Sequence, residues 1–271
     1  MAKDNSLRVE GATLFYQVRG SGPPLLILQS GHGDADAANA LCDELADRYT
    51  VITYDRRGMS RSKIDAPDES LTLATHSDDA HRLFTALTNE RSFVFGSSIG
   101  ALIGLDLVAR HPDQVAVLVA HEPPAFELLP EKERNRAMRL QEEAEEAFRR
   151  EGAEAGFKKF VELAAVDYND REPEVALPPP TSQTSANLSF FFANDSPAVR
   201  RYRLDLAALH KSSTRIVPAV GQSAAGSAPY EAAEALAEKL GLKSAVFPGG
   251  HTGWLLRPKG FAAKLKQVLG G

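Results

Sequence analysis

The chain has 271 residues, of which 43% are hydrophobic, and its 31 basic and 36 acidic side chains leave a net charge of -5. This length and apolar content are enough for one sizeable core, so we expect a single catalytic domain that carries an insertion. The charges form no long run of one sign that would follow a phosphate backbone, and nucleic acid is therefore not an expected partner.

Signals for targeting and redox chemistry are sparse. Residues 1–8 are polar and lack the apolar core of a signal peptide, and no stretch approaches about 18 uninterrupted apolar residues. A cytoplasmic protein without a membrane partner is the resulting expectation. Cys42 is the only cysteine, which excludes an intrachain disulfide and a cysteine pair for zinc, and we expect it in the core. A homodimer is expected only because dimers are the commonest oligomers of soluble proteins.

Apolar runs bounded by turn residues alternate with segments of helical period along most of the chain. This alternation predicts an α/β fold in which helices cover both faces of a mostly parallel, eight-stranded sheet. The expected strands are residues 8–11 and 12–18, paired as a hairpin, then 24–29, 50–54, 92–95, 115–120, 215–220 and 244–247. The expected helices are residues 37–49, 71–87, 99–110, 230–240 and 258–269.

The segment after the sixth expected strand has a different character. Residues 127–160 are rich in charge and helical in pattern, prolines at 178–180 end this pattern, and three consecutive phenylalanines follow. We interpret residues 123–210 as a helical lid inserted into a core made of residues 1–122 and 211–271. Candidate pocket residues are Gly31, Phe190, Phe191 and Phe192, although packing inside the lid is the simpler explanation of the phenylalanines.

A candidate nucleophile lies in the segment Gly96-Ser97-Ser98-Ile99-Gly100, which fits the pattern Gly-x-Ser-x-Gly. The pattern alone is weak, but here it directly follows an expected strand and directly precedes an expected helix. The glycines suit a strained turn that leaves no room for a Cβ, and this turn would hold the Ser98 hydroxyl above the sheet. Free N–H groups at the helix N-terminus would favour a developing oxyanion. The alternative is that Ser97 and Ser98 only cap the helix.

A serine hydroxyl needs a neutral imidazole within hydrogen-bond reach to accept its proton. His251 follows a glycine turn at the end of the last expected strand. Because the carboxyl ends of parallel strands meet in one crevice, this position brings His251 toward Ser98 and makes it the predicted base. The alternative is an ordinary loop histidine. Four other histidines are expected at the surface or at helix ends, namely His76, His81, His111 and His210.

The order Ser98 before His251, the glycine turn, the Gly-rich loop after the third strand and the inserted lid resemble the α/β-hydrolase superfamily over nearly the whole chain. Residues 54–62 (YDRRGMSRS) and 121–124 (HEPP) resemble a bacterial branch of small members, which implies no particular substrate. The resemblance implies a triad acid after the strand that follows the lid. Residues 220–226 (VGQSAAG) contain no carboxylate, so that position lacks its acid.

Glu122 is the predicted acid. Glu231 and Glu234 lie on the next expected helix, about two to four turns too far along to orient an imidazole. Glu122 instead ends the sixth expected strand, where some members of the superfamily, including one group of haloalkane dehalogenases, place their acid. It would fix the tautomer of His251 and stabilise the imidazolium. The alternatives are that Glu122 only complements a helix N-terminus, or that Ser223 or water orients His251.

The resemblance also implies an oxyanion hole in the loop Ser30-Gly31-His32-Gly33, with the backbone N–H of His32 paired with that of Ile99. Ser30 stands where the family commonly has histidine. The charge cluster of Asp55, Arg56 and Arg57 is expected to hold loops together and receives no catalytic role.

These predictions describe a serine hydrolase that cleaves an ester or lactone of a small to medium hydrophobic molecule, without a cofactor or a metal. No Gly-x-Gly-x-x-Gly fingerprint for a dinucleotide is present at the serine turn. The nearest alternative is hydrolysis of a carbon–carbon bond, followed by a cofactor-free oxygenase or perhydrolase on the same scaffold. An alternative of another class is a ligand receptor with slow turnover.

Overall fold

A computed structural model describes residues 3–31, 33–66, 71–177 and 179–270. Within these residues, nine strands form one sheet in the order β1-β2-β4-β3-β6-β7-β8-β9, and β5 pairs separately with β2. The pairs from β4 to β9 are parallel, whereas β2 is antiparallel to β1, β4 and β5. The strands are β1 (Lys3–Val9), β2 (Ala12–Arg19), β3 (Pro24–Leu28), β4 (Thr50–Tyr54), β5 (Lys63–Ile64), β6 (Ser92–Ser97), β7 (Val115–His121), β8 (Arg215–Gly221) and β9 (Ala245–Phe247).

Two features of the antiparallel edge differ from the sequence prediction. The expected eight strands are joined by β5, whose two residues are too few to produce an apolar pattern. The first strand begins at Lys3 instead of residue 8, because every residue of β1 pairs in register with β2 although most of its side chains are exposed. An edge strand with exposed, polar side chains lacks the apolar run that predicts a strand from sequence.

Two apolar layers cover the two faces of the sheet, as expected. Successive side chains of a strand point to opposite faces, so Leu26 and Leu28 of β3 belong to one layer while Leu25 and Ile27 belong to the other. The first layer packs against α2 (Leu73–Leu87), α3 (Ile99–Arg110), α8 (Leu206–Lys211) and α9 (Ala228–Leu240). The second packs against α1 (Asn39–Leu45) and α11 (Pro258–Gly270).

Cys42 of α1 lies in the second layer and is fully buried, as predicted. Burial raises the pKa of its thiol to about 12, so it is a thiol and not a thiolate at neutral pH. No helix within the described ranges is both long enough and apolar enough to cross a bilayer.

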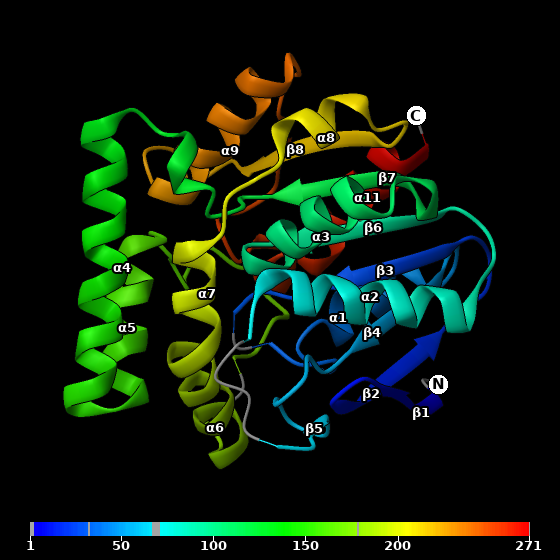
Figure 1. Ribbon diagram of the computed structural model, residues 1–271, viewed down its shortest axis with the longest axis horizontal. Coiled ribbons are helices and arrows are strands. Elements are labelled where there is room, and N and C mark those ends of the chain that lie inside the picture. Colours follow the sequence, from blue (N-terminus) through cyan, green and yellow to red (C-terminus); the bar gives the residue numbers. More distant parts are fainter. Residues whose placement is uncertain (1–2, 32, 67–70, 178, 271) are drawn as a thin grey trace.

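A group of helices connects β7 to β8 and lies beyond the carboxyl ends of the parallel strands (Figure 1). Gly152, with a φ of +94°, divides the charged segment, which was expected to be helical, into two helices. The helices before α8 are α4 (Glu131–Glu151), α5 (Ala153–Leu163), α6 (Ser182–Phe190), a π-helical turn (Phe191–Asp195) and α7 (Ser196–Arg201). We call residues 123–210 the helical insertion.

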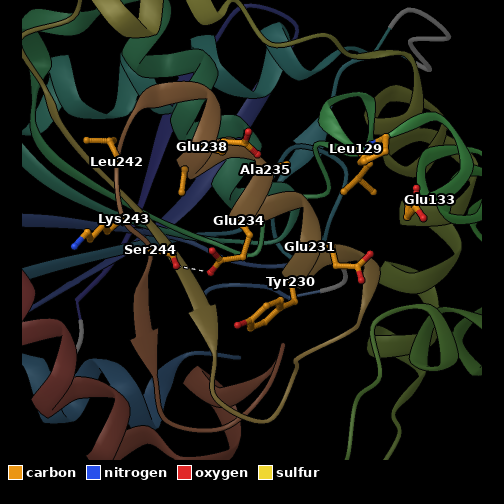
Figure 2. Close-up of a pocket in the computed structure, with 12 residues that line it drawn as sticks. Leu129, Glu133, Tyr230, Glu231, Glu234, Ala235, Glu238, Leu242, Lys243 and Ser244 are labelled. Carbon is orange, nitrogen blue, oxygen red and sulfur yellow. Dashed lines mark hydrogen bonds between the residues drawn. The ribbon is translucent and has the colours of Figure 1, made fainter.

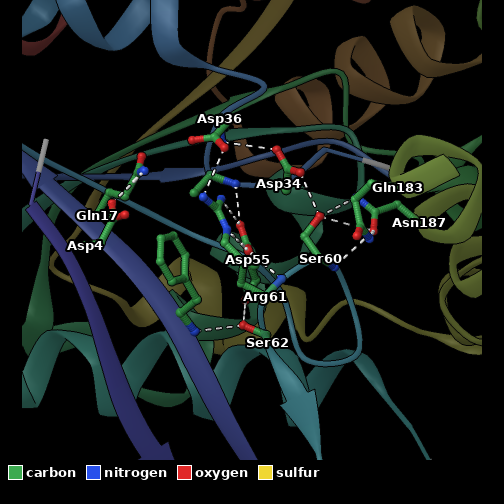
Figure 3. Close-up of polar contacts among 12 residues, drawn as sticks. Asp4, Gln17, Asp34, Asp36, Asp55, Ser60, Arg61, Ser62, Gln183 and Asn187 are labelled. Atoms are coloured by element: carbon green, nitrogen blue, oxygen red, sulfur yellow. Dashed lines mark hydrogen bonds and ion pairs between the residues drawn. The ribbon is translucent and has the colours of Figure 1, made fainter. Parts of the chain in front are cut away.

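Polar contacts tie the helical insertion to the loops at the carboxyl ends of β3 and β4 (Figure 3). Asn187 of α6 accepts a hydrogen bond from the backbone N–H of Ser60 at 3.0 Å and donates one to its hydroxyl at 2.9 Å. The same hydroxyl donates to Asp34 at 2.7 Å. Asp55 holds the neighbouring loops together, because its carboxylate accepts from the N–H of Ala35 and pairs with Arg61, in agreement with the structural role expected of it.

Candidate active site

Ser98 occupies a strained turn between β6 and α3. Its φ of +57° and ψ of -124° fall in a region that non-glycine residues rarely adopt. The turn brings backbone so close that a Cβ on Gly96 would lie 2.4 Å from the carbonyl oxygen of Gly100, and one on Gly100 would lie 2.0 Å from that of Leu28. Only glycine fits at either position, which explains physically why the serine stands between two glycines.

The N-terminal turn of α3 supplies backbone donors beside the serine. The first N–H groups of a helix have no acceptor within the helix, and Ile99, the first residue of α3, lines the same cavity as Ser98. His32, the other predicted oxyanion donor, lies outside the described residues. Its neighbour Gly31 is described, and the ring of Phe191 packs so close that a Cβ on Gly31 would lie 2.7 Å from it.

Glu122 and His251 form a buried hydrogen-bonded pair. Oε2 of Glu122 lies 2.7 Å from Nδ1 of His251, and their side chains are 0% and 1% exposed. The other carboxylate oxygen accepts the backbone N–H of Gly221 at 2.8 Å. Glu122 itself has a φ of +46°, a strained conformation at the end of β7. Ser223, the alternative orienter, donates its hydroxyl hydrogen bond to Asp170 at 2.5 Å.

The environment of Glu122 favours the carboxylate form. Burial acts to raise its pKa, but the hydrogen bond from His251, the electrostatic effect of the neighbouring His121 and His251 imidazoles and the Gly221 N–H outweigh burial and hold the pKa below its ordinary value. Because the Glu122 carboxylate accepts a hydrogen bond from Nδ1, a neutral imidazole carries its proton on Nδ1, and Nε2 is left as a proton acceptor. Nε2 is buried and has no hydrogen-bond partner among the described residues.

His121, the residue before Glu122, lies in an aromatic environment and is neutral. Its ring lies among the rings of Phe95, Phe247 and Phe261, with centroids 5.4 to 6.4 Å apart. Burial is the main cause that lowers its pKa to about 4, so the ring is uncharged at neutral pH. The sequence gives no sign of this role, because His121 continues the apolar strand β7 as an ordinary end residue.

Ser98 opens into a narrow apolar cavity beneath the helical insertion. Its volume is about 20 Å³, which leaves room for about one water molecule. Most of the side chains that line the cavity are apolar and belong to the insertion, including Phe126, Phe160, Leu163, Phe191 and Val199. Gln141 is the one lining residue with a side-chain amide. The Phe160 ring also meets the His251 imidazole edge-on, with centroids 6.3 Å apart, so the nucleophile and the imidazole adjoin the same apolar wall.

The three consecutive phenylalanines separate into different environments, because a helix turns successive side chains by about 100°. Phe191 lines the Ser98 cavity. Phe190 packs into the space above Gly58, and Phe192 stacks on Phe148 with ring centroids 5.5 Å apart. Phe191 is among the described residues that line this cavity, and Phe190 and Phe192 are not.

The prediction that His76 lies at the surface or at a helix end is wrong. His76 is fully buried, and its Nε2 lies 2.9 Å from Asp195 in the π-helical turn. Asp195 also pairs with Arg56 at 3.1 Å, and Arg56 donates to the carbonyls of Gln29 and Ser30 at 3.1 and 3.0 Å. Burial acts to raise the pKa of Asp195, but the charges of His76 and Arg56 outweigh it and keep the pKa below its ordinary value.

A larger open groove of about 720 Å³ lies along α9, and none of its described lining residues also lines the Ser98 cavity (Figure 2). Glu231 and Glu234, the carboxylates that follow β8, line this groove, and Glu234 accepts a hydrogen bond from the Ser244 hydroxyl. Neither makes the contact with His251 that Glu122 makes, in agreement with the prediction that they lie too far along the helix.

The fold and the serine turn together define an α/β hydrolase. The family model of the alpha/beta hydrolase fold matches residues 23–210. The uncharacterized hydrolase YraK of Bacillus subtilis is 39% identical over 270 residues, which cover 98% of this chain and 96% of that protein. The chain belongs to the α/β-hydrolase family, as the serine turn and the alternating elements predicted.

Solved structures of other hydrolases share the whole fold. The enol-lactonase from Burkholderia xenovorans LB400 has a TM-score of 0.75 at 20% identity, with 98% of this chain and all of that chain covered. A thermophilic esterase from Thermogutta terrifontis has a TM-score of 0.74 at 22% identity, with 99% and 98% covered. At these identities the likeness is one of fold.

Proposed function

We propose that the protein is a serine hydrolase that cleaves an ester or lactone of a small to medium apolar molecule through an acyl-enzyme on Ser98. The observation that carries this proposal is the Glu122–His251 pair, which fixes Nδ1 as the donor and leaves Nε2 as an unpartnered base. Ser98 in its strained turn and the N-terminus of α3 supply the nucleophile and the oxyanion donor.

The reaction proceeds in two halves. Nε2 of His251 accepts the Ser98 proton while Oγ attacks the carbonyl carbon, and Glu122 stabilises the imidazolium that forms. The N–H of Ile99 and a donor from the loop that contains His32 hold the oxyanion. His251 then protonates the departing alcohol oxygen, which leaves an acyl group on Ser98. In the second half His251 takes a proton from a water molecule as the water oxygen attacks the acyl carbon. The bond between the acyl carbon and Oγ then breaks, His251 returns the proton to Oγ, and the acid departs.

The cavity favours an apolar substrate that enters by displacing side chains. Its lining carries aromatic and aliphatic side chains from the insertion, and the space open to water is too small for an ester. Residues 123–210 therefore act as a lid over a core made of residues 1–122 and 211–271. An esterase and an enol-lactonase share this fold, which agrees with carbonyl–oxygen bonds as the target.

Steady-state hydrolysis tests the proposal. The substrates are p-nitrophenyl esters from acetate to decanoate and a series of lactones, assayed with wild type, Ser98→Ala and His251→Ala. Wild type should turn over repeatedly, and both variants should lose about 10³-fold or more in kcat. Inert wild type would contradict the ester proposal, and would instead favour the carbon–carbon hydrolase or the slow-turnover receptor.

A further inference from the structure

Gln141 carries one unsatisfied polar atom and borders the apolar cavity of Ser98. It lies on α4, is 6% exposed and lines the cavity. Its Nε2 donates to the backbone carbonyl of Ser196 at 2.9 Å and to the Ser196 hydroxyl at 3.0 Å. Its carbonyl oxygen, Oε1, is buried and has no hydrogen-bond partner among the described residues.

The orientation of this amide is fixed by its partners. A carbonyl only accepts, so the NH₂ group of Gln141 must face the carbonyl of Ser196. The Ser196 hydroxyl gives its single hydrogen to Glu145 at 2.9 Å and therefore accepts from Gln141. Glu145 is held in turn by Arg200 at 3.2 Å. Rotating the amide by half a turn would place Oε1 against the carbonyl oxygen of Ser196, and neither atom has a hydrogen to donate. Oε1 is therefore the free atom.

An acceptor buried without a donor is unfavourable, and folded proteins rarely retain one without a reason. The other side chains that line this cavity, apart from Ser98, are apolar. The free oxygen therefore belongs to the one side-chain amide among the described residues that line the space where the substrate must lie. A hydrogen-bond donor of the substrate would satisfy it.

We propose that Gln141 is a specificity-determining residue that accepts a hydrogen bond from a hydroxyl or amide N–H of an otherwise apolar ester or lactone. This inference rests on the proposed function of the Ser98 site. Groups that offer only acceptors, such as a carboxylate or an ether, meet an acceptor at this position and are disfavoured. A site built to bind a donor rejects the analogue that lacks it, because its own polar atom then stays unpaired.

Matched substrate pairs test the inference. One series carries a hydroxyl at C-2, C-3 or C-6 of p-nitrophenyl hexanoate, with fluorine as the donor-free replacement. The other carries an acetylamino group at C-4 or C-5, with the N-methyl derivative as the replacement. In at least one pair, wild type should show a kcat/KM about 10- to 100-fold higher for the donor-bearing member. The series that responds distinguishes a hydroxyl from an amide donor.

Gln141→Leu should abolish this preference by lowering kcat/KM for the donor-bearing ester about 10-fold or more, while the donor-free member changes less than about threefold. A purely structural role would lower both members alike. Gln141→Met, which keeps the length of the side chain, repeats the test if the leucine variant does not fold. The matched control is Gln267→Leu on the exposed face of α11, which should keep the wild-type ratio.

Binding to Ser98→Ala separates this inference from the proposed function. Calorimetry with the same ester pairs should show tighter binding of a donor-bearing member, and the added Gln141→Leu change should remove the difference. If wild type hydrolyses none of the esters but the binding preference appears and depends on Gln141, the ester proposal fails and the inference holds. Equal binding or no binding across all pairs overturns the inference, as does a hydrolysis ratio that Gln141→Leu leaves unchanged.

Discussion

Oε2 of Glu122 lies 2.7 Å from Nδ1 of His251, although 129 positions separate the two residues in the chain. The contact joins the end of β7 to the loop after β9, across the intervening strand β8. The second oxygen of Glu122 accepts the N–H of Gly221, at the end of that strand. The carboxylate is therefore oriented from both sides, and this geometry leads to the first prediction.

Glu122→Gln should reduce kcat/KM by about 10³-fold without unfolding the protein. The Gly221 N–H requires an acceptor, so the amide oxygen will face it and the NH₂ group will face Nδ1 of His251. The imidazole must then accept at Nδ1, which places its proton on Nε2 and removes the base. Ester hydrolysis and circular dichroism measure the effect. Glu234→Gln, in the groove along α9, is the control. Near wild-type activity of Glu122→Gln would show that another group orients His251.

His121 should make the protein less stable as the pH falls from 7 to 5. Its pKa is about 4 in the fold and 6.5 in the unfolded chain. Between these values the unfolded chain binds the additional proton, so acid favours unfolding, by about 1.4 kcal/mol for each pH unit in this window. Urea unfolding should show a loss of about 2 kcal/mol between pH 7 and 5 from this residue.

His121→Phe removes the titrating ring and keeps an aromatic side chain among the three phenylalanines. The loss of stability between pH 7 and 5 should therefore be smaller in this variant than in wild type. His210→Gln, at an exposed position of α8, should keep the wild-type pH dependence. The same pH dependence in His121→Phe would mean that His121 is not the group responsible.

Gly100→Ala should destabilise the fold by about 3 kcal/mol or more, because its Cβ would meet the carbonyl oxygen of Leu28 at 2.0 Å. To relieve this contact, the backbone of β3 or of α3 would have to move, and either movement would displace Ser98. The control is Gly270→Ala, where no atom lies within 4 Å of the added Cβ. Thermal and urea unfolding measure both variants, and a Gly100→Ala protein as stable as the control would refute the close approach.

Asp195→Asn should destabilise the protein by about 3–5 kcal/mol, because it leaves the buried guanidinium of Arg56 without its counter-charge. The change should also loosen the loop of residues 29–31, whose carbonyls Arg56 binds, so activity should fall together with stability. Glu10→Gln, which breaks the exposed pair with Arg82, should change stability by less than about 1 kcal/mol. Equal stabilities in the two variants would contradict a structural role of the Asp195–Arg56 pair.

The parts of the site that follow strand ends were predictable from sequence. Ser98 lies between an apolar strand and a helix, and its flanking glycines have a direct steric cause. Glu122 could be selected because the end of β8 lacks a carboxylate while the end of β7 has one. In both cases the parallel sheet brings the carboxyl ends of the strands together, so a residue that directly follows a strand can be placed near the site from sequence.

The parts of the site that depend on the helical insertion were not predictable. His76 and Asp195 are 119 positions apart, and no local pattern marks a buried histidine in a charged helix. Gln141 lies in the same kind of charge-rich segment, where its burial against α7 depends on how the insertion folds back. The environments of Phe190 and Phe192 depend on the same packing.

Detection of the acyl-enzyme tests the central claim most directly. Wild type is mixed with p-nitrophenyl butyrate, quenched with acid within the first turnovers and digested for mass spectrometry. We predict one butyryl group per chain on Ser98, formed with a matching burst of p-nitrophenol, and no adduct in Ser98→Ala. Steady turnover with an adduct on another residue, or undiminished turnover by Ser98→Ala, would contradict Ser98 as the nucleophile.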